Sequence, residues 1–416
     1  MTKPRNYILW QALITLILGT LIVGILEYAT RIRYYRKFGP KSLAPLALRD
    51  EYRGWRLNPA YARIGRQHDA QGFRRDRDVS LKKPPNTIRI FMTGGSVTYG
   101  FGGDQDDRGQ FVSDNQTIEY YLERQLNQAL PFKHWEVINA GVSGYRLNQE
   151  LIYLESDLLQ YQPDYVISMD GFTDIDYMWE YWSQPKGTYN PYAITPLSEE
   201  FNLLANPASA KSIVFFANTW CRTNSALYRV MTDHLAPLGW ESAAQATKLS
   251  AATRHTGNTV RLSDLTQAEQ SRFTAIRDQV EYYPHLVQQM HRILNLDGVK
   301  DIFLLQPYVG LTHKQLTDSE RQMVEMQRRT PGRLYTFQQI YPNLATEMGS
   351  LARQEGFEFK DLTGVFDQSS EQTFGDYAHL TPEGNRIIAE RLFQLLKDKV
   401  PDSLSAAAMV PGDPRR

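Results

Sequence analysis

The chain has 416 residues, a length that suggests one large domain or two. Its 46 lysines and arginines balance 46 aspartates and glutamates, so the net charge gives no argument for nucleic-acid binding. The single cysteine, Cys221, excludes an intramolecular disulfide and a multi-cysteine metal site.

Near the N-terminus, residues 8–26 form a run of 19 residues without a formal charge. A helix of about 20 apolar residues spans a bilayer, and Trp10 and Tyr28 would lie near its two interfaces. We therefore predict an uncleaved, single-pass transmembrane anchor in residues 1–30. A cleaved signal peptide is the alternative, but no small-x-small cleavage site follows the run cleanly.

The basic residues around this run do not settle its orientation. Lys3 and Arg5 precede it, and a larger basic group follows it: Arg31, Arg33, Arg36, Lys37 and Lys41. The positive-inside tendency taken alone favours a cytoplasmic body, yet long domains translocate largely regardless of such a bias. Residues 31–85 read as a membrane-proximal linker that becomes a surface layer.

The body of the chain alternates between short apolar runs and helical patterns. The runs that predict strands are 88–92, 135–139, 164–169, 300–306 and 357–362. The patterns that predict helices are 113–130, 147–159, 271–296, 344–355 and 382–399. This alternation predicts a parallel sheet with crossover helices in a domain spanning residues 86–400. Residues 176–296 interrupt this alternation of strands and helices and suggest a helical insertion. The tail, 401–416, is rich in small residues and proline and is expected to be flexible.

Polar or glycine-rich turns follow the first three predicted strands. Ser96 comes directly after Gly94 and Gly95, residues 139–144 read Asn-Ala-Gly-Val-Ser-Gly, and residues 170–174 read Asp-Gly-Phe-Thr-Asp. These turns fall on one edge of a parallel sheet, the edge where open α/β sheets bind ligands. Ser96 is therefore either part of a simple turn or a nucleophile.

A second pattern lies near the C-terminus, where Asp376 and His379 are three residues apart just before a helix. A carboxylate at this spacing can hold one imidazole nitrogen and leave the other facing outward. A serine nucleophile requires such a base and orienting group. The alternative is a capping aspartate beside an incidental surface histidine.

Taken together, four blocks resemble the SGNH/GDSL hydrolase family. Residues 94–100 (Gly-Gly-Ser-Val-Thr-Tyr-Gly) resemble its first block, residues 139–144 its glycine block, and residues 376–384 (Asp-Tyr-Ala-His-Leu-Thr-Pro-Glu-Gly) its last block. Residues 170–174 lie where its asparagine-bearing block belongs. The order matches over residues 86–399, apart from the insertion. Residues 72–74 (Gly-Phe-Arg) also look like the membrane-anchored bacterial members.

The resemblance implies a three-layer α/β/α sandwich with a flavodoxin-like parallel sheet. It also implies that Ser96 is the nucleophile, His379 the base and Asp376 its orienting group. The reaction would pass through an acyl-enzyme that water or a sugar hydroxyl resolves. The backbone N–H groups of Ser96 and Gly144 would form the oxyanion hole, with a third donor from residue 173.

The sequence departs from the family pattern at two positions. Thr173 stands where the family has asparagine, and a threonine hydroxyl can donate a hydrogen bond but reaches less far than a carboxamide. Thr173 serves as the third donor if its loop lies closer to the oxyanion. Gly95 replaces the aspartate of the Gly-Asp-Ser form, which removes no catalytic group. Asp174 is expected to brace the loop.

Three further residues are candidates for substrate contact. Trp179 and Trp182 could stack on sugar rings or pack one face of a helix, and Gln306 could contact substrate or cap a turn. The histidines other than His379 form no ligand-spaced cluster, and no phosphate-binding glycine loop occurs, so we predict neither a metal nor a cofactor.

The expected function is that of a membrane-anchored serine esterase or O-acyltransferase. It would act on acyl groups, most simply acetyl, of a cell-envelope carbohydrate, with its body outside the cytoplasm and no nucleic-acid partner. The alternative is a binding or scaffold protein on a weakened hydrolase fold within envelope polysaccharide machinery. A lipid esterase is a third hypothesis, and it draws only on the membrane-proximal position.

Overall fold

The structure is a computed structural model that describes residues 5–39, 44–63, 65–102, 112–181, 217–218, 220–221, 223–235 and 260–399. The predicted tail at 401–416, much of the predicted insertion and Trp182 lie outside the described residues. The chain separates into two units, which are treated one at a time below. One unit contains residues 1–48, 60–64 and 196–251, and the other contains residues 49–59, 65–195 and 252–416.

The larger unit is built on a five-stranded sheet in which every pairing is parallel. The strands, in spatial order, are β6 (His134–Asn139), β5 (Thr87–Gly94), β7 (Tyr165–Asp170), β8 (Lys300–Leu305) and β9 (Glu358–Asp361). This is the flavodoxin-like order, in which the first strand of the sheet pairs on one side with the second and on the other with the third. The predicted fold class is confirmed.

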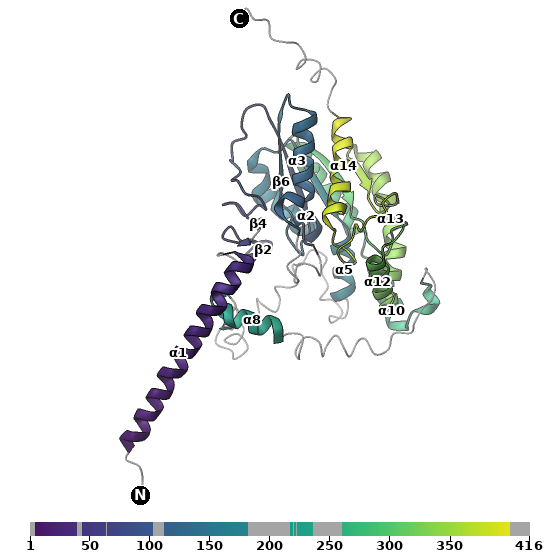
Figure 1. The fold of residues 1–416 in the computed structure, drawn as a ribbon. Coiled ribbons are helices and arrows are strands. Elements are labelled where there is room, and N and C mark those ends of the chain that lie inside the picture. The colour runs from purple at the N-terminus through teal and green to yellow at the C-terminus, as the bar shows by residue number, and fades with distance from the viewer. Residues whose placement is uncertain are drawn as a thin grey trace, which may run out of the picture. The chain divides into compact units, whose positions relative to one another are not determined.

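Helices cover both faces of this sheet. On one face α3 (Ile118–Ala129) packs against β6 and against α14 (Pro382–Lys397), and these two helices lie side by side (Figure 1). The other face carries α4 (Leu147–Tyr153), α11 (Tyr282–Leu296) and α13 (Pro331–Glu355), which contact β5, β8 and β9 respectively. The structure thus has the three predicted layers.

Apolar periodicity explains why these helices pack as they do. Leu122 and Leu126 of α3 are one turn apart and fully buried, as are Ile388 and Leu392 of α14. Burying one such side chain contributes about 1.5–3 kcal/mol relative to leaving it in water. Because all five strands run in the same direction, their carboxyl ends meet at one edge, where Ser96 begins the helix α2 (Ser96–Tyr99).

The remaining elements of the chain are short or lie outside these layers. The short strands are β1 (Ala47–Asp50), β2 (Gly54–Leu57), β3 (Ala62–Arg63) and β4 (Arg66–Gln67). The other α-helices of the larger unit are α5 (Phe172–Tyr181), α10 (Gln267–Arg277) and α12 (Asp318–Gln327). Single helical turns are η2 (Asp114–Gln116), η3 (Leu154–Leu158, a π-helical turn), η4 (Leu159–Tyr161) and η7 (Leu262–Asp264).

The region from 176 to 296 differs from the single insertion that the pattern predicts. Its last helix, α11, packs on β8 and α4, so it is a crossover helix of the sheet itself. The helix expected over 271–296 is divided into α10 and α11, and Pro284 lies in the first turn of α11, where its missing N–H has no cost. Residues 196–251 group with the N-terminal unit.

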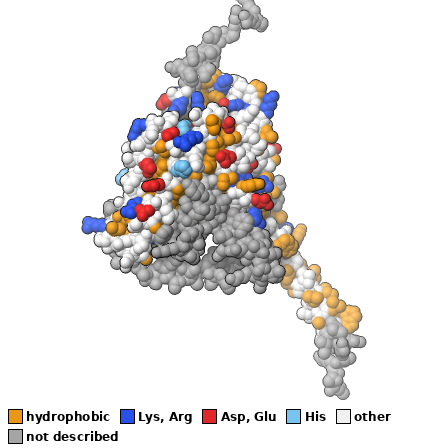
Figure 2. Space-filling view, turned by 180° about the vertical axis from the view of Figure 1, so that it is seen from behind, with side chains coloured by type: hydrophobic (Ala, Val, Ile, Leu, Met, Phe, Trp, Pro, Cys, Tyr) orange, Lys and Arg blue, Asp and Glu red, His pale blue; other side chains and the backbone are white. Residues whose placement is uncertain are grey.

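In the smaller unit, α1 (Arg5–Phe38) runs without a break through the predicted anchor. Residues 10–37 form a helix long and apolar enough to cross a membrane, a test that a signal sequence also passes. Hydrophobic side chains lie along the described part of this helix in Figure 2, and Leu16 is 67% exposed.

Beyond the apolar run, α1 contacts α8 (Ala226–Leu235). The Glu27 carboxylate accepts hydrogen bonds from the Ser225 hydroxyl and from the backbone N–H groups of Ala226 and Leu227 at 2.7–3.0 Å. Glu27 therefore caps the N-terminus of α8, which links residue 27 to a segment about 200 residues later in the chain.

Candidate active site

The turn after β5 presents Ser96 at the carboxyl edge of the sheet. Gly94 has a φ of +150°, and a Cβ atom there would lie 2.1 Å from Thr98 Oγ1 and 2.8 Å from the Met169 carbonyl oxygen. Only glycine fits this position, because both the backbone conformation and the space exclude a side chain. The chain turns directly from strand to helix here and leaves Ser96 half-buried as the first residue of α2.

The structure brings Ser96, His379 and Asp376 into one hydrogen-bonded row. His379 Nε2 lies 2.7 Å from Ser96 Oγ, and His379 Nδ1 lies 2.7 Å from Asp376 Oδ2. Because an ionised carboxylate can only accept, Nδ1 carries the proton, and in the neutral imidazole Nε2 is free to accept from the Ser96 hydroxyl. This is the arrangement that a serine nucleophile and its base require.

Asp376 is itself held in place by the turn that it begins. Its Oδ1 accepts hydrogen bonds from the backbone N–H groups of Ala378 and His379, both at 2.8 Å. Burial alone would raise the pKa of the Asp376 carboxyl, but the His379 imidazole and these two N–H donors hold that pKa below its usual value. Asp376 is therefore a fixed negative charge behind the imidazole.

Two backbone N–H groups are candidates for the oxyanion hole. Within the described part of the chain, neither the Ser96 N–H nor the Gly144 N–H donates a hydrogen bond to the protein. Gly144 is exposed and has a φ of +82°, a left-handed conformation that favours glycine. Both predicted donors are thus available to an oxygen that gains charge during the reaction.

The two departures from the family pattern are in contact with each other. A Cβ atom placed on Gly95 would lie 3.0 Å from Thr173 Oγ1 and 3.3 Å from the Tyr145 carbonyl oxygen. The missing side chain at residue 95 therefore lets the short Thr173 hydroxyl approach the backbone next to Ser96. That the hydroxyl also reaches an oxyanion stays a prediction.

Asp174 anchors the loop that carries Thr173. Its Oδ1 accepts from the Leu147 backbone N–H at 3.2 Å and from the Tyr282 hydroxyl at 3.0 Å. These bonds join the start of α5 to the start of α4 and to α11. The bracing role predicted for Asp174 agrees with this geometry.

The burial of Trp179 and Gln306 contradicts their predicted contact with substrate. Trp179 is only 5% exposed, with the Arg272 guanidinium 4.6 Å from its ring centre and Gly332 against its edge, so it packs α5 onto α10 and α13. Gln306 is 2% exposed, and its backbone N–H donates to the Asp170 carbonyl. Neither side chain presents a surface to a sugar, and Trp182 lies outside the described residues.

Other aromatic side chains flank the site instead. The Phe101 ring meets the His379 ring edge to face at 5.0 Å. Trp55 donates from Nε1 to the Ser143 carbonyl at 3.0 Å and lies against Gly144. Phe101 follows the first block directly and could have been noticed in the sequence, whereas nothing local connects Trp55 to a loop 88 residues away.

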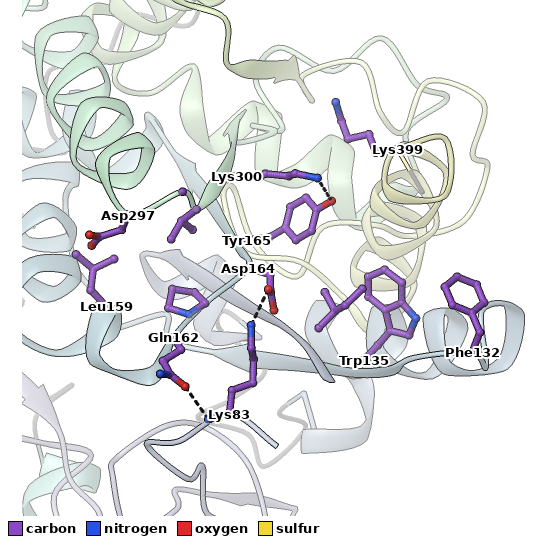
Figure 3. A pocket seen from close by; sticks show the side chains of 14 residues that line it. Lys83, Phe132, Trp135, Leu159, Gln162, Asp164, Tyr165, Asp297, Lys300 and Lys399 are labelled. Atoms are coloured by element: carbon purple, nitrogen blue, oxygen red, sulfur yellow. Dashed lines mark hydrogen bonds and ion pairs between the residues drawn. The ribbon is translucent and has the colours of Figure 1, made fainter. Parts of the chain in front are cut away.

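The opposite edge of the sheet carries a cavity that is not the candidate site. It has a volume of about 630 Å³ and lies at the amino ends of β5, β6, β7 and β8 (Figure 3). Two pairs of its polar side chains bind each other, since Lys83 donates to Asp164 at 2.6 Å and Lys300 donates to the Tyr165 hydroxyl at 3.3 Å. No residue of the Ser96 row lines it.

Comparisons with known proteins add little to this geometry. A scan against protein-family models and a search of curated proteins found no match. Among solved structures, the chain is similar to LAE5, an alpha/beta hydrolase enzyme from the metagenome of Lake Arreo, with 14% identity and a TM-score of 0.36 over 74% of this chain and 94% of that one.

It is also similar to Axe2, an acetylxylan esterase from Geobacillus stearothermophilus, with 13% identity and a TM-score of 0.34 over 74% of this chain and 93% of that one. The acetyl xylan esterase AlAXEase gives 12% identity and a TM-score of 0.34 over 74% of this chain and all of that one, 100%. TM-scores this low establish neither a shared fold nor a shared activity.

Beneath the candidate site lies a cluster of fully buried carboxyl groups. Ser168 Oγ lies within hydrogen-bond distance of both Asp170 Oδ2 and Glu150 Oε2, yet its one proton can serve only one of them. Burial, together with neighbouring carboxylates, raises the pKa of Asp170 to about 6 and that of Glu150 well above its usual value. The folded state therefore favours the protonated form of both carboxyl groups.

This cluster predicts an unusual pH dependence of stability. The folded-state pKa of Asp170, about 6, lies above the ordinary value of 3.8, so its contribution is present at low pH and is lost as the pH rises from about 4 through 6. Asp170→Asn should stabilise the protein at pH 8 by about 1–3 kcal/mol and leave it nearly unchanged at pH 4.5. Thermal unfolding of the full-length protein at both pH values checks this.

The exposed Asp297 supplies the control for this prediction, since Asp297→Asn removes a carboxylate from the surface of the protein. That variant should follow the wild type at both pH values. If Asp170→Asn instead unfolded at a lower temperature than the wild type at pH 8, the ionised Asp170 carboxylate would not be destabilising.

Proposed function

We propose that this chain is a membrane-anchored serine esterase or O-acyltransferase that acts on acyl groups, most simply acetyl, of a cell-envelope carbohydrate. The observation that carries the proposal is the row of hydrogen bonds from Ser96 through His379 to Asp376, which joins two parts of the chain 283 residues apart. A serine and a histidine so distant in sequence have no local reason to meet at 2.7 Å.

The geometry supports a two-step acyl transfer. Ser96 Oγ would attack the ester carbonyl carbon while its proton passes to His379 Nε2, and the Asp376 carboxylate would stabilise the resulting imidazolium. The carbonyl oxygen would take the negative charge against the Ser96 and Gly144 N–H groups. His379 would then return the proton to the departing alcohol oxygen, which leaves an acyl group on Ser96.

The second step would mirror the first. His379 would remove a proton from water or from a sugar hydroxyl, whose oxygen attacks the acyl carbon and releases Ser96. Water as acceptor gives an esterase, and a sugar hydroxyl gives an O-acyltransferase. The carbohydrate class follows from the resemblance of the four sequence blocks and from the anchor.

The anchor is supported by the contacts of α1 beyond its apolar run. Glu27 caps α8, so residue 27 belongs to the folded unit. Removal of a signal peptide after the apolar run would discard or expose this cap, which favours an uncleaved single-pass anchor. We further propose that the body lies outside the cytoplasm, where envelope carbohydrate is found.

The scaffold alternative depends on a weakened oxyanion hole. The contact between Thr173 and Gly95 argues against it, because the hydroxyl lies beside the nucleophile's backbone. The lipid-esterase hypothesis gains no specific support from the described residues.

One labelling experiment tests the proposal. A cell-impermeant fluorophosphonate probe should label wild-type protein on intact cells and should not label Ser96→Ala. Thr173→Val keeps the shape and removes the hydroxyl, so it should label about 10²-fold more slowly if that hydroxyl is the third oxyanion donor. Thr173→Asn should label at a rate similar to that of the wild type.

The outcomes separate the hypotheses. An unlabelled wild type beside a labelled Thr173→Asn would favour the scaffold protein. Labelling that appears only after the cells are lysed would contradict the exported body but leave the serine hydrolase standing.

A further inference from the structure

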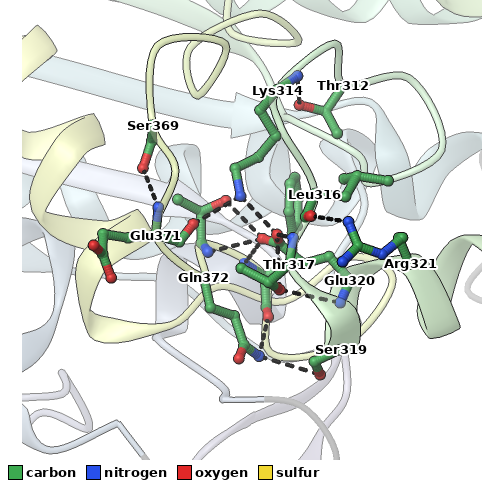
Figure 4. A network of polar contacts seen from close by, with 12 residues as sticks. Thr312, Lys314, Leu316, Thr317, Ser319, Glu320, Arg321, Ser369, Glu371 and Gln372 are labelled. Carbon is green, nitrogen blue, oxygen red and sulfur yellow. Dashed lines mark hydrogen bonds and ion pairs between the residues drawn. The ribbon is translucent and has the colours of Figure 1, made fainter.

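A fully buried ion pair lies beside the turn that carries Asp376 and His379. Lys314 Nζ donates to Glu320 Oε2 at 2.6 Å, and both side chains have no exposed surface (Figure 4). Lys314 belongs to the loop after β8, and Glu320 lies in the first turn of α12. Neither residue belongs to a recognisable sequence block.

Glu320 uses its two oxygens on two different parts of the chain. Oε2 accepts from Lys314 and from the backbone N–H and hydroxyl of Thr317, which begins α12. Oε1 accepts from the Thr373 N–H at 2.9 Å, the Thr373 hydroxyl at 3.2 Å and the Phe374 N–H at 3.2 Å. Hydrogen bonds to an ionised carboxylate are roughly twice as strong as neutral ones.

Thr373 and Phe374 form one leg of a hairpin that has the catalytic pair at its tip. Phe374 pairs with Leu380, and the Thr381 N–H donates to the Thr373 carbonyl at 3.0 Å. Between these legs the Gly375 N–H donates to the His379 carbonyl at 2.8 Å. The other leg ends at Thr381, which caps α14.

Ser96 lies on a different element from this hairpin, so the distance from Ser96 Oγ to His379 Nε2 depends on where the hairpin sits. We infer that the Lys314–Glu320 pair is a positioning element for the reaction: Glu320 fixes the Thr373–Phe374 leg and thereby sets His379 at hydrogen-bond distance from Ser96. This inference rests on the proposed function for its effect on rate, although the contacts themselves do not.

The energetics favour positioning over a purely stabilising role. A buried ion pair is often no more stable than two apolar side chains of similar volume, because both charges lose their hydration. Two methionines would fill the same space but could not accept the Thr373 and Phe374 N–H groups. A displacement of about 1 Å in a catalytic group can lower the rate about 10²-fold.

Two double variants of the full-length protein test whether the Glu320 side-chain oxygen is needed as a hydrogen-bond acceptor. Lys314→Met with Glu320→Met removes the pair without leaving a buried charge, and Lys314→Met with Glu320→Gln restores one carbonyl oxygen. With p-nitrophenyl acetate as substrate, the Met/Met variant should lose about 10²-fold in kcat with KM changed less than about 3-fold. The Met/Gln variant should recover most of that loss.

Amide hydrogen exchange measures the same hairpin without requiring activity. In the Met/Met variant, exchange should accelerate by about 10-fold or more not only at Thr373 and Phe374 but also at Ala378 and His379, whose N–H groups bind Asp376. A control variant, Glu136→Gln, removes the negative charge of the Arg89–Glu136 pair between β5 and β6 and should change neither kcat nor this exchange.

The failures can be told apart. A wild type that does not turn over p-nitrophenyl acetate would count against the proposed function, while the exchange data would still decide the role of Glu320. Unchanged exchange at Ala378 and His379, or a Met/Met kcat within about 3-fold of wild type in an active enzyme, would overturn the inference.

Discussion

Asp376→Asn should lower kcat for p-nitrophenyl acetate by about 10⁴-fold while the protein stays folded. The asparagine oxygen can take over both hydrogen bonds from the Ala378 and His379 N–H groups, so the turn keeps its shape. Its amide NH₂ would then face His379 Nδ1 and donate to it. The imidazole proton would move to Nε2, which would point a donor at Ser96 and could no longer accept its proton.

Asp361→Asn is the matched control for this change. Asp361 ends β9 and accepts the Thr363 N–H, so it makes a similar local turn contact away from the Ser96 row. Its kcat should equal that of the wild type. If Asp376→Asn kept kcat within about 10-fold of wild type, Asp376 would not be the group that orients the base.

Arg74→Met should produce the largest loss of stability, about 3–5 kcal/mol, which corresponds to a fall in unfolding temperature of about 10 °C. The Arg74 side chain is fully buried and donates to Asp114 Oδ1 and to the carbonyls of Tyr99, Gly100 and Val112 at 2.6–2.9 Å. A methionine of similar length would leave these three carbonyls and a partly buried carboxylate without their donor.

Arg77→Met tests whether charge alone explains this loss. Arg77 pairs with Glu123 but is about half exposed, and exposed pairs contribute at most about 1 kcal/mol. Differential scanning fluorimetry should therefore show a clearly lower unfolding temperature for Arg74→Met than for Arg77→Met. Equal unfolding temperatures would mean that the buried bonds of Arg74 do not stabilise the turn after Ser96.

The sequence predicts the sheet well because each strand is an apolar run with a sharp end. Residues 88–92 predict the core of β5, and the glycines after it follow from a turn that has no space for a Cβ atom. The position of Ser96 follows the same logic as the strands, since parallel strands bring their carboxyl ends to one edge. The pairing of Ser96 with Asp376 and His379 is instead an implication of the resemblance of four sequence blocks to a known family. The strands and the turn before Ser96 can be predicted because each depends on a short, continuous stretch of the sequence.

The features that the sequence does not predict depend on partners far along the chain. The aromatic run at 177–182 cannot reveal that Trp179 packs against Arg272, and a pattern of period 3.6 cannot distinguish that role from sugar stacking. The helix expected over 344–355 begins at Pro331 and passes through Pro342, because its tertiary contacts override the local break. Three of the six hydrogen bonds of Glu320 likewise reach residues about 50 positions away, at Thr373 and Phe374.

The separation of Ser96 from His379 also orders events during biosynthesis. A chain is made from its N-terminus, so Ser96, the proposed nucleophile, is made well before the hairpin that carries His379, its proposed base. In the proposed mechanism Ser96 lacks its base until this hairpin has been made, and α14, which follows the hairpin directly, packs against α3. If the proposed function holds, a chain that ends before this hairpin should not cleave esters, and the appearance of activity would report that the C-terminal part of the domain has folded.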